Sequence, residues 1–183
     1  IYKAQPIFYI TNRFSVAGHG DTITWPPYSD YMDYELEVAV VIGKRGRDIK
    51  AADAMDHVFG FTIFNDFSAR DTQLREMQGM LGPAKGKSFD AGNVFGPWIA
   101  TTDEIAVYRE MRCVAKINGK VVTDSRLGEM LHGFEDMIAF ISNAETLHPG
   151  EIIGGGTVDD GCGLERFEFL SDGDVVELTV EDR

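Results

Sequence analysis

The fold depends on one run of sequence, Asp33-Tyr34-Glu35-Leu36-Glu37-Val38-Ala39-Val40-Val41-Ile42-Gly43. Its apolar and β-branched residues predict a strand, in which side chains two positions apart share a face. Asp33, Glu35 and Glu37 therefore point to one side. The other side carries hydrophobic residues that we expect to face the core, namely Tyr34, Leu36, Val38, Val40 and Ile42. The acidic side also becomes apolar at Ala39 and Val41, so the acids stand where the strand enters the interior.

Carboxylates this close together repel each other and raise each other's pKa unless positive charge lies between them. A divalent cation on Glu35 and Glu37 would relieve that repulsion. Asp66 follows a second predicted strand, 58–64, and supplies a third carboxylate. Three converging carboxylates suit the hard cations Mg²⁺, Mn²⁺ and Ca²⁺, and the lack of an accompanying histidine or cysteine argues against zinc. We therefore predict Glu35, Glu37 and Asp66 as metal ligands.

The simpler alternative for these acids is the solvated face of an ordinary strand, which is the usual meaning of an isolated Glu-x-Glu pair. The apolar residues around the pair and the motifs that follow it favour the metal site. Asp33 shares the acidic face but lies farther out, and we expect it behind the ligands or in solvent.

Composition restricts the class of protein. The 183 residues suffice for one domain with a substantial core, and the formal net charge of −13 argues against nucleic acid or an anionic membrane as a partner. No run reaches the ~18 apolar residues of a membrane span, and no signal-peptide pattern opens the chain. Cys113 and Cys162 lack metal-site spacing, so we expect two reduced cysteines in a cytoplasmic protein. We expect a single domain over 1–183 that lacks native segments at both ends.

Three helices are expected from periodicity and capping signals. The first is short and covers roughly 51–57. The second covers roughly 69–78, with Ser68 as its N-cap. The third is amphipathic and covers 127–142.

Strands outnumber these helices. Asn118-Gly119 predicts a tight hairpin between strands 111–117 and 120–124, and further strands are expected over 152–153 and 175–180. Strands and helices do not alternate in a βαβ pattern. This favours a β-rich α+β fold, a mixed β-sheet roll or sandwich with short peripheral helices.

Arg70 and Gln73 are three positions apart on the second helix, so they share a face one turn from the proposed metal. An arginine can grip a carboxylate with two parallel hydrogen bonds, and a glutamine can donate to a keto or enolate oxygen. The alternative is a surface ion pair of Arg70 with Asp71 or Glu76.

Two glycine-containing loops carry further candidates. Lys87 follows Gly82-Pro83-Ala84-Lys85-Gly86, where the backbone can approach a ligand closely. Its ammonium could stabilise an oxyanion or orient a water, and the alternative is a solvated loop lysine. Gly154-Gly155-Gly156-Thr157 could present backbone amides and one hydroxyl to a ligand, although glycine runs usually only form turns.

Together these motifs resemble the fumarylacetoacetate hydrolase family. The resemblance spans nearly the whole chain in the family's order, and its most specific segment is Asn65-Asp66-Phe67-Ser68-Ala69-Arg70-Asp71-Thr72-Gln73. The other matching segments are 33–43, 60–64, 81–90, 96–98, 118–119 and 149–157.

The resemblance implies a fold similar to the family's C-terminal domain and a homodimer. It implies that Mg²⁺, Mn²⁺ or Ca²⁺ is held by Glu35, Glu37 and Asp66. It also implies that Arg70, Gln73 and Lys87 are catalytic and bind the substrate, and that Thr157 is a further substrate-binding residue.

The resemblance finally implies a function, because members act on 2-oxo or 1,3-dioxo acids through metal-bound enolates. We first expect a divalent-metal-dependent hydrolase that cleaves a C–C bond in acylpyruvate-like or fumarylacetoacetate-like diketo acids. One alternative is a decarboxylase, isomerase or dehydratase of 2-oxo acids that uses the same site. Another is a non-catalytic protein that binds the metal and a 2-oxo acid. The family's catalytic histidine and its carboxylate partner have no match in this sequence, which favours reactions that need no activated water.

Overall fold

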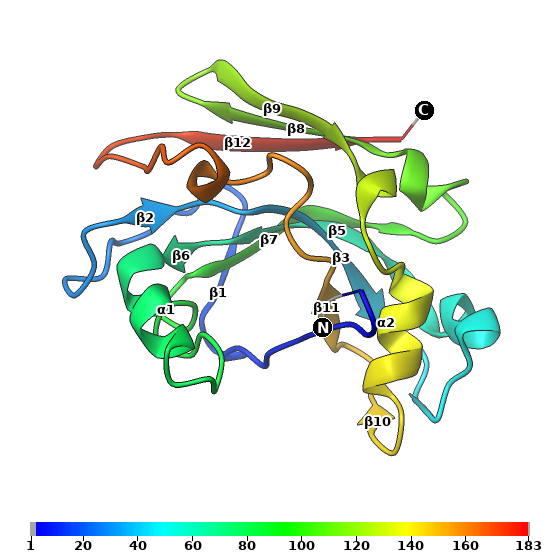
Figure 1. Ribbon diagram of the computed structural model, residues 1–183. Coiled ribbons are helices and arrows are strands. Elements are labelled where there is room, and N and C mark those ends of the chain that lie inside the picture. Colours follow the sequence, from blue (N-terminus) through cyan, green and yellow to red (C-terminus); the bar gives the residue numbers. More distant parts are fainter. Residues whose placement is uncertain (1–2, 183) are drawn as a thin grey trace.

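The computed structural model describes residues 3–182, and its centre is a five-stranded mixed sheet (Figure 1). The strand order is β1 (Val16–Gly18), β7 (Asn93–Thr101), β5 (Val58–Asp66), β3 (Leu36–Ile42) and β11 (Ile152–Gly154). β1 runs parallel to β7, and the other neighbours pair antiparallel. The predicted acidic strand is therefore an inner strand of the main sheet.

A second, antiparallel sheet lies over the first one (Figure 1). It consists of β12 (Val176–Glu181), β8 (Arg112–Ile117) and β9 (Lys120–Arg126), and the predicted hairpin joins the last two strands. Two short pairs complete the strands, β2 (Met32–Asp33) with β6 (Ser68–Ala69) and β4 (Gly46–Arg47) with β10 (Thr146–Leu147). This sheet-rich arrangement confirms the predicted fold class.

The two α-helices are short and lie at opposite ends of the main sheet (Figure 1). They are α1 (Arg70–Met77) and α2 (Phe134–Ile141). Four 3₁₀ helices are also present among the described residues, η1 (Ala51–His57), η2 (Tyr108–Glu110), η3 (Leu127–Glu129) and η4 (Gly163–Glu165). The helix predicted over 51–57 is thus present as a 3₁₀ helix.

The prediction of one long helix over 127–142 is wrong for the first half of that range. Residues 127–129 form η3, and α2 begins only after Gly133, which occupies the N-cap position. Glycine is a poor helix former, and this segment holds two of them. A Cβ added to Gly128 would lie 2.8 Å from the Arg109 carbonyl oxygen, so the backbone approach there requires glycine.

The prediction of Ser68 as an N-cap is also wrong. Ser68 lies in β6 opposite Asp33, and its hydroxyl donates to the Asp66 carbonyl oxygen at 2.9 Å. Ala69 takes the N-cap position of α1 without a side-chain hydrogen bond. Strand pairing with β2 therefore prevailed over the local capping signal.

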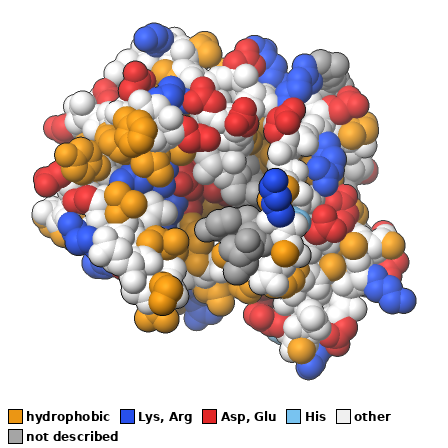
Figure 2. Space-filling model, viewed as in Figure 1, with side chains coloured by type: hydrophobic (Ala, Val, Ile, Leu, Met, Phe, Trp, Pro, Cys, Tyr) orange, Lys and Arg blue, Asp and Glu red, His pale blue; other side chains and the backbone are white. Residues whose placement is uncertain are grey.

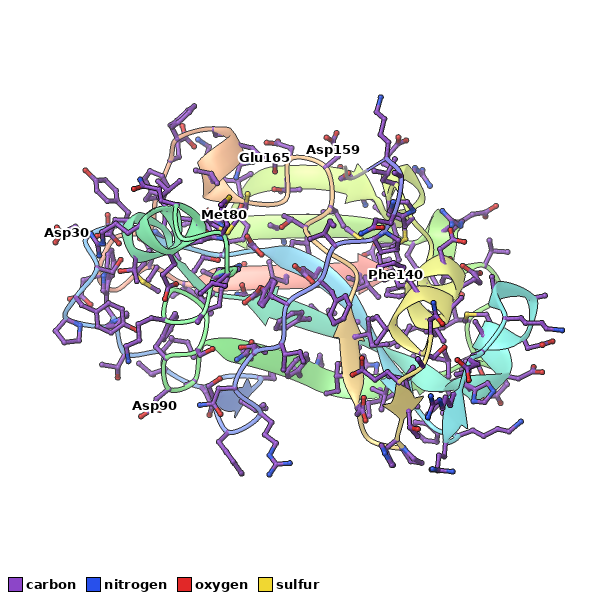
Figure 3. The ribbon with its side chains drawn as sticks, turned by 60° about the horizontal axis from the view of Figure 1, so that its bottom comes forward. Asp30, Met80, Asp90, Phe140, Asp159 and Glu165 are labelled. Atoms are coloured by element: carbon purple, nitrogen blue, oxygen red, sulfur yellow. The ribbon has the colours of Figure 1, made fainter. Side chains whose placement is uncertain are left out.

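Both faces of β3 are buried. One face packs into the hydrophobic core through Leu36, Val38, Val40 and Ile42, together with residues of β8 and α2. Glu37 lies on the other face and is only 5% exposed. Figure 3 shows the N-terminal segment crossing the main sheet on its way to β1. The solvated-strand alternative is thereby excluded.

Candidate metal centre

Three carboxylates converge at the junction of β3 and β5. Glu37 pairs with Phe64 across the two strands, and the Asp66 amide donates to the Glu35 carbonyl at 3.3 Å. This register places Glu35, Glu37 and Asp66 on one face, with one oxygen of each carboxylate within 4.8 Å of the others. All three side chains are buried. The predicted convergence of these residues is confirmed.

Glu35 is the acid best supplied with positive charge. Its Oε1 accepts from Arg70 at 2.7 Å, and its Oε2 lies 2.8 Å from the Lys87 Nζ. Burial alone would raise the pKa of Glu35, but Lys87 and Arg70 outweigh burial and hold that pKa below its usual value. Glu35 is therefore ionised and firmly held.

Glu37 differs from Glu35 in the direction of its pKa shift. Its Oε2 accepts from the Gly156 amide at 3.1 Å. Burial, followed by repulsion from Asp66 and Glu35, raises the pKa of Glu37 well above its usual value. Burial also raises the pKa of Asp66, although Lys87 opposes that shift. Both carboxylates would be stabilised as anions by additional positive charge.

Asp66 carries the clearest sign of an open coordination position. Its Oδ2 accepts from Lys87 at 2.9 Å, whereas its Oδ1 is buried without a hydrogen-bond partner. Buried acceptors are rarely left unpaired. An oxygen-only set of three carboxylates with one unpaired oxygen fits a hard divalent cation. Glu35, Glu37 and Asp66 could therefore hold Mg²⁺, Mn²⁺ or Ca²⁺.

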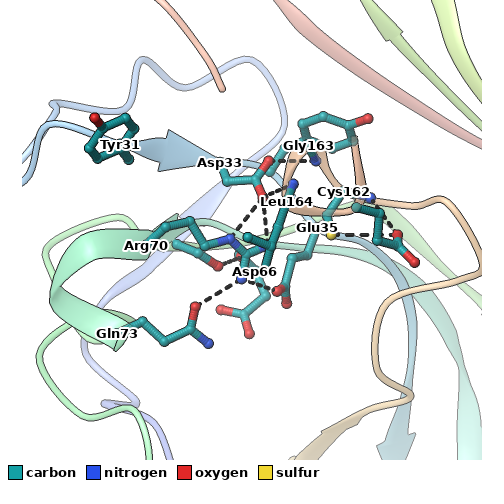
Figure 4. A network of polar contacts seen from close by, with 12 residues as sticks. Tyr31, Asp33, Glu35, Asp66, Arg70, Gln73, Cys162, Gly163 and Leu164 are labelled. Atoms are coloured by element: carbon teal, nitrogen blue, oxygen red, sulfur yellow. Dashed lines mark hydrogen bonds and ion pairs between the residues drawn. The ribbon is translucent and has the colours of Figure 1, made fainter. Parts of the chain in front are cut away.

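Asp33 is buried, so of its two expected positions, behind the ligands or in solvent, the second is wrong. Its side chain is 0% exposed and forms an ion pair with Arg70 at 2.6 Å. It also accepts from the Gly163 and Leu164 amides at 2.7 and 2.9 Å (Figure 4). Asp33 lies behind the three acids and holds Arg70. Its alternation with Glu35 indicated the shared face, but not these partners.

Arg70 is directed at protein carboxylates. It is 3% exposed, and in addition to its bonds to Asp33 and Glu35 it donates to the Gln73 Oε1 at 2.9 Å (Figure 4). The alternative of a surface pair with Asp71 or Glu76 is wrong, because both of those acids bond elsewhere. Arg70 therefore lies beside the acids and supports Glu35, and Gln73 is linked to them through Arg70. Their roles toward a substrate stay predictions.

Lys87 is 1% exposed, which excludes the solvated-loop alternative. Its Nζ lies between Glu35 and Asp66, at 2.8 and 2.9 Å. The loop before it packs closely on α1, since a Cβ added to Gly86 would lie 2.8 Å from the backbone nitrogen of Gln73. Glycine at this position therefore lets the loop insert Lys87 between the two acids.

The glycines at the end of β11 and in the loop after it border the acids on the side of Glu37. A Cβ added to Gly154 would lie 2.6 Å from the Glu37 Oε2. Beside this loop is a cavity of about 550 Å³, which is lined by Thr157, by apolar residues such as Phe8 and Ile153, and by charged residues such as Arg126 and Glu129, but by none of the three acids. Thr157 follows Gly156, whose amide bonds Glu37, and it lines a space large enough for a small ligand.

One residue near the acids has no sequence signal. The hydroxyl of Tyr9 donates to the Asp66 Oδ2 from a segment without regular secondary structure. Neither periodicity nor a motif could have placed it there.

The metal-free protein is expected to lose stability as pH rises. A carboxyl whose folded-state pKa is raised, as for Glu37 and Asp66, favours folding below its unfolded pKa, and this contribution is lost as pH rises through the folded value. Added Mg²⁺ should oppose the loss by compensating the carboxylate charge. We would measure melting temperatures between about pH 5 and about pH 8, in chelator and in Mg²⁺. An equal loss in both solutions would contradict a cation on these acids.

Comparisons with known proteins cover nearly the whole chain. The family model for the fumarylacetoacetate (FAA) hydrolase C-terminal domain matches residues 2–182. The chain is 40% identical over 182 residues to human "Oxaloacetate tautomerase FAHD2A, mitochondrial", covering 97% of this chain and 56% of that protein. The chain thus spans about half the length of this curated relative.

Solved structures show the same fold. A fumarylacetoacetate hydrolase from Exiguobacterium antarcticum matches with a TM-score of 0.89 and 31% identity, over 98% of this chain and 64% of that chain. A 2-hydroxyhepta-2,4-diene-1,7-dioate isomerase from Mycobacterium marinum matches with a TM-score of 0.86 and 32% identity, over 97% and 66% of the two chains. Within residues 3–182, no helix has the length and apolar character needed to cross a membrane.

Proposed function

The chain belongs to the fumarylacetoacetate hydrolase family, and from that membership we propose that it isomerises a small 2-oxo acid, interconverting the keto and enol forms of an oxaloacetate-like substrate. The observation that carries the proposal is the buried acid centre with Lys87 inserted between Glu35 and Asp66. Similarity to the human tautomerase and to the mycobacterial isomerase supports it. We therefore prefer the isomerase, which the sequence offered as an alternative, to the C–C hydrolase that was expected first.

The reaction requires little of the protein. Keto–enol interconversion moves one proton between carbon 3 and the oxygen on carbon 2, and it consumes no water. A divalent cation on Glu35, Glu37 and Asp66 would act as a Lewis acid toward the keto oxygen. The Lys87 ammonium adds positive charge where that oxygen becomes negative, and burial strengthens this interaction.

The remaining candidates take different roles in this proposal. Gln73 lies beside the acids and would donate its amide to the substrate. The Thr157 hydroxyl would bind a substrate group from the adjoining cavity. Arg70 would act through Glu35 by fixing the orientation of that carboxylate, because its guanidinium already bonds Asp33 and Glu35.

The test is an oxaloacetate assay. The purified chain, with Mg²⁺ or Mn²⁺, should accelerate the ultraviolet absorbance change that follows enol-to-keto conversion, and chelator should remove the acceleration. Proton NMR of the Mg²⁺ mixture should show pyruvate forming no faster than in an enzyme-free control with the same Mg²⁺, because the cation alone slowly decarboxylates oxaloacetate. Pyruvate formed faster than in that control would instead indicate the decarboxylase alternative. Saturable oxaloacetate binding with no acceleration would indicate the non-catalytic alternative.

C–C bond hydrolysis stays the second candidate. It is favoured by the likeness to the Exiguobacterium fumarylacetoacetate hydrolase and by the apolar side chains that line part of the cavity, which could receive an acyl chain. Acylpyruvates incubated with the chain and Mg²⁺ would then yield pyruvate and a carboxylic acid. If this cleavage were faster than oxaloacetate isomerisation, hydrolysis would become the first candidate.

The homodimer stays a prediction. Figure 2 shows hydrophobic side chains at the surface over α1. Four hydrophobic residues of α1 and the turn after it, Leu74, Met77, Met80 and Leu81, are between 45% and 95% exposed, and contiguous exposed apolar patches often mark interaction surfaces. Sedimentation velocity would test the association. The cytoplasmic location also stays a prediction, because the human relative is described as mitochondrial.

A further inference from the structure

The N-terminal segment contributes a tyrosine hydroxyl to the acid centre. Tyr9 lies in a stretch without helix or strand, far along the chain from β5, and its O–H donates to the Asp66 Oδ2. The residue as a whole is 40% exposed, whereas Asp66 is 1% exposed. The ring of Tyr9 therefore reaches from the surface, and its hydroxyl end is buried at the acids.

This placement of Tyr9 is supported by the residue two positions farther on. The hydroxyl of Thr11 lies 3.4 Å from the Lys87 carbonyl oxygen and 3.3 Å from the Ser88 hydroxyl. The Asn93 side-chain amide, on β7, lies 3.4 Å from the same Thr11 hydroxyl. The N-terminal segment is thus attached both to the Lys87 loop and to the main sheet.

The hydrogen bonds at Asp66 are distributed unequally between its two oxygens. Oδ2 accepts from Tyr9 and from Lys87, and both donors come from outside β5. Oδ1 is buried and has no hydrogen-bond partner. Two donors on one oxygen restrict rotation of the carboxylate about its χ2 torsion and keep the other oxygen available.

We propose that Tyr9 is a positioning residue for the cation, because its hydroxyl holds Asp66 with Oδ1 free to act as a ligand. The inference rests on the metal centre of the proposed function and adds to it a residue outside the acid set. A tyrosine hydroxyl ordinarily loses its proton only near pH ~10, so the Tyr9 hydroxyl is a neutral donor at physiological pH. Such hydrogen bonds to metal ligands orient the ligands and strengthen binding.

The test is Tyr9→Phe, which removes the hydroxyl and retains the ring. Calorimetry with Mg²⁺ and with Mn²⁺, in the absence of substrate, should show cation affinity weakened by about 10- to 100-fold. The matched control is Tyr108→Phe, because the Tyr108 hydroxyl also donates to a carboxylate, that of Glu135 on α2, at 2.5 Å. We expect the control to bind both cations as the wild type does.

A second background separates positioning from general loosening of the fold. If Tyr9 acts through Asp66, Tyr9→Phe should weaken Mn²⁺ binding in the wild type and should add little in an Asp66→Asn background. Equal weakening in both backgrounds would overturn the positioning role and assign Tyr9 to structural support.

The remaining outcomes distinguish this inference from the proposed function. Unchanged affinity in Tyr9→Phe, beside a wild type that binds Mg²⁺, would overturn only the role of Tyr9. A wild type that binds neither cation would overturn the metal centre and the role of Tyr9 together. Normal binding by the wild type, with the expected loss in Tyr9→Phe, would support Tyr9 even if the oxaloacetate assay showed no isomerisation.

Discussion

Arg70→Met is expected to lower the free energy of unfolding by about 3–5 kcal/mol, the usual cost of removing one partner from a buried ion pair. Arg70 is the cation that Asp33 faces, and Asp33 is 0% exposed. Methionine would leave that carboxylate buried with only the Gly163 and Leu164 amides as donors. Glu35 would also lose one of its two cationic partners, so the acid centre would be less ordered.

Chemical denaturation of the metal-free protein would measure this loss. The matched control is Arg112→Met, which removes an arginine that also grips one carboxylate through two nitrogens, that of Asp124, but at the surface. Exposed ion pairs contribute little to stability, so the control should unfold like the wild type. If Arg70→Met unfolded normally and raised only the KM for oxaloacetate, Arg70 would be a substrate clamp, as the family resemblance implies.

Glu37→Gln is expected to reduce cation-dependent turnover by more than about 100-fold, because loss of a ligand should exceed the 10- to 100-fold cost of losing a residue that only orients one. The same substitution should raise the melting temperature of the metal-free protein. Glu37 is buried, faces two other acids and has a pKa raised well above its usual value. A neutral amide of similar shape removes that repulsion.

The informative measurement is the melting temperature in chelator and in Mg²⁺. The wild type should be stabilised by Mg²⁺, whereas Glu37→Gln should begin higher in chelator and respond weakly to the cation. Glu177→Gln on β12 is the control, because that strand position is exposed. A Glu37→Gln protein that is less stable in chelator would show that the carboxylate has a structural partner that outweighs repulsion.

Much of the metal centre was predictable because it depends on strand periodicity. The alternation of Glu35 and Glu37 with core residues requires both acids to share a face. The position of Asp66 at the end of a second strand placed a third acid within reach of them once β3 and β5 paired. Sequence reasoning was weaker where local signals compete, as at Ser68, where strand pairing with β2 prevailed over a capping motif.

By itself the sequence determined the β-rich fold, the family and the three acids that could hold a cation, because these follow from side-chain periodicity and short motifs. Only the tertiary structure decided which basic side chain pairs with which carboxylate. Arg70 pairs with Asp33 and Glu35, Lys87 joins Glu35 to Asp66, and Glu37 is left with a backbone amide. These partners depend on how loops and termini pack on the sheet. Tyr9 shows the same limit, since its hydroxyl reaches Asp66 through the path of a segment that has no periodicity of its own.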